Sequence, residues 1–164
     1  MPSTANPGPR PAGAARPRGR GRALRAWHAY RAWRNLPATL VAVGWARLHG
    51  VRPVLGADLL VECAPMPPRT YGRGGTTIGN AWLHGGLGGP GRRRHESRHA
   101  DQYALLGTAP FLALYGLNAL VTRNDPRLNV FERWAGLADG GYAPARGTGS
   151  GRTRTARTAT SSSA

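Results

Sequence analysis

The sequence predicts an α+β fold, a mostly helical domain with a short antiparallel sheet, flanked by disordered basic tails. Several stretches between residues 23 and 142 repeat apolar residues at helical spacing. Between them lie two short segments that read as strands, separated by a region rich in proline and glycine. Both ends of the chain lack apolar periodicity. We therefore expect a single domain at residues 23–142.

The positive charge of the chain belongs mostly to its ends. The 164 residues carry a formal net charge of +16. Residues 1–34 contain eight Arg, residues 143–164 contain four, and neither segment contains an acid. We expect disordered tails at 1–22 and 143–164, which can contact nucleic acid without sequence preference. Because every basic residue is Arg, as a GC-rich coding sequence would produce, the charge is weak evidence for such a partner.

Cysteine content and hydropathy limit the class of protein. Cys63 is the only cysteine, which excludes an intramolecular disulfide and a cysteine cluster for a metal. The apolar run Leu36–Ala46 is too short to span a bilayer, and a leader of more than thirty residues precedes it. We therefore expect a soluble, cytoplasmic protein with no membrane span, in which His and carboxylate side chains hold any metal ion.

Two helices are expected to open the domain. The spacing of apolar residues predicts a helix over Ala23–Trp33, and Pro37 begins a second helix that runs to Gly50. Both are expected to pack as scaffold. Aromatic residues at helical spacing are more often core than binding surface, and we place three tryptophans in the core on this ground: Trp27, Trp33 and Trp45.

Two strands and two further helices are expected downstream. The strands lie at 54–64 and 76–83, and the edge of the second could receive an extended peptide. Residues 110–121 are apolar on nearly every face, which predicts a buried helix. A short helix is expected at 129–136, where a glycine ends it.

A helix expected over residues 90–107 carries the sequence H-E-x-x-H. His95 and His99 lie at i and i+4, so their imidazoles can converge on one cation, and Gln102 shares their stripe. Glu96 lies about 100° around the helix and can reach a metal-bound water. The arrangement predicts two metal ligands and one general base. The alternative is that the histidines are hydrogen-bonded helix residues and Glu96 is a solvated charge.

A hydrolytic zinc site needs a third protein ligand. We assign Glu132, with Asp139 as a weaker rival, because the remaining acids lie on a strand, on another helix face or in a polar turn. Glu132 also has a structural alternative. Asn129 followed three residues later by Glu resembles a capping box, in which the carboxylate would bond to the backbone at the start of the helix.

At these residues the chain resembles the zincin metallopeptidases of the gluzincin type, and also short bacterial HExxH proteins. The likeness covers about residues 50–142 and rests on the motif and on Glu132. It implies Zn²⁺ as the cofactor, His95, His99 and Glu132 as its ligands, and Glu96 as the general base. In that family an acid commonly follows the Glu ligand by four residues and orients a histidine, whereas this chain has Gly136 there.

Two functions from different classes follow. The first is a zinc-dependent hydrolase, a peptidase or a degenerate relative, that acts on a peptide or protein. Candidates for a residue that stabilises the oxyanion are Tyr115, Tyr142 and His84. The second is a basic accessory protein whose Arg-rich tails bind nucleic acid or another anionic partner, with a non-catalytic HExxH helix.

Overall fold

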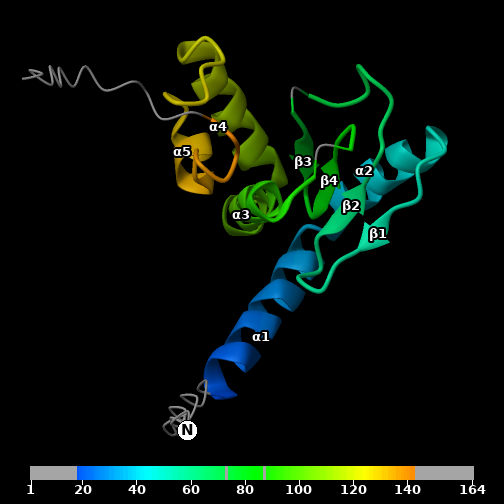
Figure 1. The fold of residues 1–164 in the computed structure, drawn as a ribbon. Helices are drawn as coiled ribbons and strands as arrows, with labels where there is room; N and C mark the ends of the chain where they lie inside the picture. Colours follow the sequence, from blue (N-terminus) through cyan, green and yellow to red (C-terminus); the bar gives the residue numbers. More distant parts are fainter. Residues whose placement is uncertain (1–17, 73, 87, 143–164) are drawn as a thin grey trace, which may run out of the picture.

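The computed structural model describes residues 18–72, 74–86 and 88–142, which form an α+β fold as the sequence predicts (Figure 1). In chain order the elements are α1 (Arg18–Arg34), α2 (Leu36–Leu48), β1 (Val54–Leu55), β2 (Val61–Cys63), β3 (Thr76–Ile78), β4 (Ala81–Leu83), α3 (Pro90–Leu106), α4 (Thr108–Val121) and α5 (Val130–Ala135). Helix α1 begins before the expected domain boundary, so residues 18–22 are helical. The rest of both expected tails, 1–17 and 143–164, lies outside the described residues.

The sheet has the order β1-β2-β4-β3 and is mixed, not antiparallel throughout as expected. Each expected strand is divided by a turn, at Leu59 and at Gly79, where the backbone adopts positive φ. Strands β1 and β3 pair antiparallel with their neighbours, whereas β2 and β4 are parallel. The two expected strands are therefore two hairpins, and the sequence analysis missed both turns. Local signals also cannot predict the pairing of strands that are not consecutive in the chain.

One face of the sheet packs against α2, which contacts β3 and β4. This helix buries small side chains, namely Ala38, Thr39, Ala42 and Ala46. Ala42 and Ala46 share a core cluster with Cys63 and Leu83 of the sheet. A Cβ atom at Gly79 would lie 2.8 Å from the backbone nitrogen of Thr39, so the β3–β4 turn requires glycine at this close approach.

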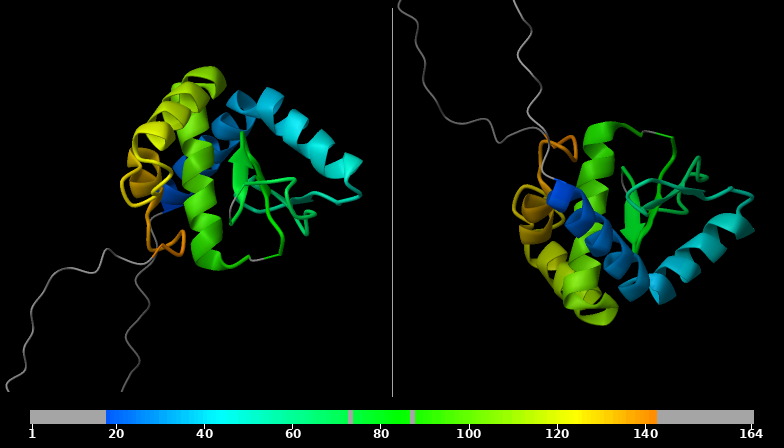
Figure 2. Two further views of the ribbon diagram at one scale, coloured as in Figure 1. Left: turned by 90° about the horizontal axis from the view of Figure 1, so that it is seen from above. Right: turned by 90° about the horizontal axis from the view of Figure 1, so that it is seen from below.

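Helix α3 lies at the centre of the molecule, between the sheet and the α4–α5 pair (Figures 1 and 2). The fully buried Arg31 of α1 fixes α1 against it. Its guanidinium donates to Ser97 Oγ at 2.6 Å, to Asp101 Oδ1 at 3.0 Å and to the Asp58 carbonyl at 2.6 Å. Asp101 therefore ties two helices together.

Two expectations about burial are wrong. Helix α4 buries only Phe111, and most of its leucines are exposed. Trp33 is 70% exposed and Trp45 is 44% exposed, so neither is a core residue. A uniformly apolar sequence does not indicate which face meets the rest of the protein, and α4 packs on one side only.

Among the described helices none is by itself long and apolar enough to cross a bilayer. Helices α3 and α4 pass that test only as a pair, which is bent by 119°.

Candidate metal centre

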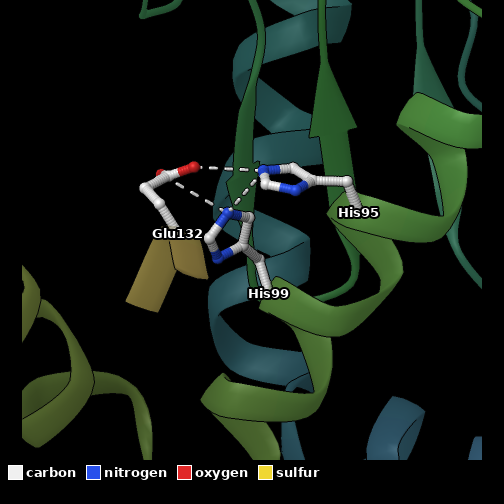
Figure 3. Close-up of side chains that lie close together, drawn as sticks. All are labelled: His95, His99 and Glu132. Carbon is white, nitrogen blue, oxygen red and sulfur yellow. Dashed lines mark hydrogen bonds and ion pairs between the residues drawn. The ribbon is translucent and has the colours of Figure 1, made fainter. Parts of the chain in front are cut away.

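Three buried side chains converge at the middle of α3: His95 and His99 from that helix and Glu132 from α5 (Figure 3). The Nε2 atoms of the histidines are 3.1 Å apart. Glu132 places Oε2 3.1 Å from His95 Nε2 and Oε1 3.5 Å from His99 Nε2. Two elements that are far apart in the sequence thus present three potential ligand atoms to one point.

Hydrogen bonds on the far side of each ring fix its tautomer. His95 Nδ1 lies 3.0 Å from the Gly136 carbonyl, which can only accept, so Nδ1 carries the hydrogen. His99 Nδ1 lies 2.8 Å from Gln102 Oε1, and the amide nitrogen of Gln102 donates to the Phe131 carbonyl. That second bond orients the amide oxygen toward His99. In their neutral forms both histidines therefore direct an Nε2 lone pair at the convergence point.

Three acceptors that face one another require a cation between them. The lone pairs and the carboxylate repel one another unless a proton or a metal ion intervenes, and the site is buried from water. Tetrahedral ligands at about 2.0–2.1 Å from a metal are about 3.3 Å from each other. The observed separations of 3.1–3.5 Å match this value. The buried group of His95, His99 and Glu132 could therefore hold a metal ion.

The Gly136 carbonyl occupies the place of the acid that the sequence lacks. The segment 136–142 is tied to α3 through Asp139, which accepts from Arg94 at 2.8 Å and from Arg98 at 2.8 Å. Arg98 also donates to the Ala135 carbonyl at 2.7 Å. Asp139 is thus a partner of two arginines and not the third ligand. Arg98 thus holds the segment that orients His95.

The side chain of Glu132 does not act as a cap. At the start of α5 the side chain of Asn129 accepts from the Phe131 backbone nitrogen at 2.9 Å, as its sequence position predicts. The Glu132 carboxylate turns instead toward the histidines and accepts from the Tyr115 hydroxyl at 2.6 Å. The ligand assignment is therefore the one that the geometry supports.

Burial and charge shift the pKa values of this group. Burial raises the pKa of Glu132, but hydrogen bonds from His95 and His99 outweigh it and the net pKa is lowered. Burial lowers the pKa of His99, yet Glu132, followed by Glu96, raises it overall. Burial and the Glu132 charge raise the pKa of Tyr115. Without a metal the cluster therefore favours one protonated histidine beside an ionised Glu132.

Glu96 lies in the same cavity as the three ligands. The cavity has a volume of about 610 Å³ and is lined by His95, Glu96, His99, Glu132, Tyr115 and Tyr142, among others. Glu96 is 6% exposed and its Oε2 accepts from Thr77 Oγ1 at 2.8 Å. Glu96 is therefore not a solvated charge. Thr77 fixes its carboxylate, a role that the sequence did not indicate.

Of the three candidates for oxyanion stabilisation, Tyr115 and Tyr142 line this cavity. His84 does not, and its Nε2 lies 3.1 Å from Glu62 on the sheet. Burial, followed by the charges of Glu132 and Glu96, raises the pKa of Tyr142 to about 12, so it remains a donor at neutral pH. The donor function of Tyr115 is already directed at Glu132.

Strand β3 forms one wall of the cavity and is the terminal strand of the sheet. Thr76 and Thr77 line the cavity together with the glycine-rich segment before them. β3 is thus the part of the expected second strand that borders the site. A comparison with models of protein families, with curated proteins and with solved structures found no match to this chain. The zincin resemblance stays a prediction from the motif.

Proposed function

We propose that this protein is a zinc-dependent hydrolase that cleaves peptide bonds. The observation that carries the proposal is that His95, His99 and Glu132 converge on one point, and that the remaining side of this point opens to a cavity. Catalytic zinc sites commonly combine three protein ligands with an open position. A fourth protein ligand would instead favour a structural site.

The chemistry of the ligands favours zinc. Two imidazoles and one carboxylate suit a borderline ion, whereas calcium and magnesium prefer oxygen ligands throughout. Cys63 is buried in the core against α2, so no thiolate contributes. The hydrogen bonds from Nδ1 to Gly136 and Gln102 supply the outer support that zinc-bound histidines usually have.

The side chains around the ligands divide the remaining tasks. Bound zinc supplies Lewis acidity, which polarises a carbonyl and acidifies water. Glu96 accepts the proton of the attacking water, with Thr77 holding its carboxylate in the cavity, and later returns it to the leaving amine. Tyr142 donates a hydrogen bond to the oxygen that gains negative charge.

An extended peptide is the substrate that the cavity wall favours. The outer edge of β3 has no strand partner in the described part of the chain, and it lies next to Glu96. A peptide backbone can add to such an edge by main-chain hydrogen bonds, which position a scissile bond without sequence specificity.

Replacement of Glu96 by Gln tests the proposal. We expect peptide cleavage by Glu96→Gln to fall by about 10²–10⁴-fold while zinc is retained, because the amide keeps the shape but cannot accept a proton. Cleavage of a fluorogenic peptide mixture by zinc-loaded protein measures this. Glu62→Gln is the control, since it removes an acid outside the cavity. Activity equal to that of Glu62→Gln would refute the proposal. Nucleic-acid binding that survives Glu96→Gln and vanishes at moderate salt would favour the accessory-protein alternative.

A further inference from the structure

In helix α2 the small apolar residues face the core and the large ones face outward, which is the reverse of the arrangement expected of a surface helix. Its buried face consists of alanines and one threonine. Its outer face carries Leu40, Val41 and Leu48, which are 60%, 72% and 81% exposed. A surface helix of a soluble monomer normally does the reverse, burying large apolar side chains against the core. Single exposed leucines are common, but a whole helix face of them indicates a partner.

Other apolar side chains extend this face. Trp33 at the end of α1 is 70% exposed, and Leu36 and Trp45 are about half exposed. Both views in Figure 2 show α2 at the margin of the molecule, with no other element of the described chain against its outer side. We define the outer α2 face as Trp33, Leu36, Leu40, Val41, Trp45 and Leu48.

The charges around this face are of one sign. Arg34, Arg47 and Arg52, which lie within α2 or close to its ends in the sequence, are exposed. No Asp or Glu occurs before Asp58, so α1, α2 and the following turn contain no acid at all. The acids that come next, Asp58 and Glu62, are both paired with Arg93.

From this combination we propose that the outer α2 face binds the surface of an anionic lipid bilayer, with α2 lying in the plane of the interface. Apolar side chains enter the boundary between headgroups and acyl chains, and Trp33 and Trp45 take the interfacial position that tryptophan prefers. The three arginines extend toward lipid phosphates, and each basic residue near an anionic surface strengthens the attraction. This binding is independent of the proposed hydrolysis.

The other possible occupants fit less well. Residues 1–17 and 143–164 contain no Leu, Ile, Val, Phe, Trp or Tyr, so by composition they offer no large apolar side chain except Met1 to cover the face. A second copy in a two-fold contact would place the same patch on both sides. The Arg34, Arg47 and Arg52 of one copy would then approach those of the other, which is repulsive.

Vesicle binding by the full-length chain tests the proposal. We expect co-sedimentation with vesicles of phosphatidylcholine and phosphatidylglycerol, and little with phosphatidylcholine alone. The double variant Leu40→Ser and Val41→Ser should reduce the partitioning by roughly tenfold or more, because two apolar side chains no longer leave water. The matched control is Leu117→Ser and Leu120→Ser on α4, which removes equally exposed apolar residues outside the outer α2 face and should leave binding intact.

Three results would overturn the proposal. The first is an absence of vesicle binding by the wild-type chain. The second is binding that the α4 variant abolishes and the α2 variant does not. The third is a dimer in sedimentation experiments that dissociates in the α2 variant without any vesicle binding, which would assign the face to a second copy. Circular dichroism of each variant checks that the fold is intact.

Discussion

At the scale of single residues, the orientation of His95 depends on a main-chain atom. The Gly136 carbonyl accepts from His95 Nδ1, and Asp139 holds the segment that carries this carbonyl through Arg94 and Arg98. A ligand ring that is held in one tautomer and orientation binds metal more tightly. Under the proposed function, Asp139 is therefore a positioning residue that would act on the metal through the backbone.

Asp139→Asn should weaken zinc affinity by about 10–100-fold without removing a ligand. The reason is that Arg94 and Arg98, which lower the pKa of the Asp139 carboxyl, lose the charge that attracts them. Competition with a chromophoric zinc indicator measures the dissociation constant. Asp125→Asn is the control, because Asp125 pairs with Arg127 in an exposed loop. Equal affinities for the two variants would contradict this role.

The pKa shifts of His99 and Glu132 predict how the stability of the zinc-free chain changes with pH, and zinc binding should change in the opposite direction near neutral pH. The pKa of His99 is raised in the folded chain. Its contribution to the free energy of unfolding is therefore complete below 6.5, the pKa in the unfolded chain, and is lost as the pH rises through the higher pKa of the folded chain. Glu132 has a lowered pKa, so its contribution is present above the unfolded value of 4.5 and is lost in acid. Zinc binding instead requires neutral histidine and strengthens as pH rises.

We therefore expect the melting temperature of the zinc-free chain to fall as the pH rises above 6.5, the unfolded pKa of His99, while the rise in melting temperature on adding zinc grows over the same interval. Thermal unfolding followed by circular dichroism measures both. Glu132→Gln, in which the ion pair is absent, should show the smaller dependence in the zinc-free state. A zinc effect that is constant with pH would argue against imidazole ligands.

At the scale of elements, the segment after α5 fits closely over the ligands. A Cβ atom at Gly140 would lie 2.8 Å from His95 Cε1 and 2.9 Å from Tyr142 Cε2. Helix α3 and this segment are thus closely packed at Gly140. A side chain at position 140 would separate them and move the Gly136 carbonyl away from His95.

Gly140→Ala should lower both stability and zinc affinity, with a loss of about 1–3 kcal/mol in the free energy of unfolding from overpacking. Gly116→Ala is the control, since a Cβ there meets nothing within 4 Å and alanine favours the helix by roughly 0.5–1 kcal/mol. Urea unfolding and zinc titration of the two variants measure the effects. Wild-type stability and zinc affinity of Gly140→Ala would show that the packing at position 140 is looser than the structure indicates.

At the scale of the whole molecule, the sequence predicts the parts whose signals are local. Helical spacing places His95, Glu96 and His99, and the cap at Asn129 marks the start of α5. Contacts between residues far apart in the chain could not be predicted from the sequence. The parallel pairing of β2 with β4 joins strands that are not consecutive, and the His95 partner is a backbone carbonyl that no residue type marks. Apolar helices such as α2 and α4 do not indicate in sequence which face meets the core.

We expect one metal ion to join α3 to α5 through His95, His99 and Glu132, and zinc content tests this most directly. Elemental analysis of the purified chain after zinc loading should give one zinc per molecule, and a hundredfold excess over the dissociation constant should add about 2.7 kcal/mol to stability. Glu132→Gln should lose this zinc, whereas Glu62→Gln should keep it. A wild-type chain without stoichiometric zinc, whose melting temperature zinc leaves unchanged, would contradict the account.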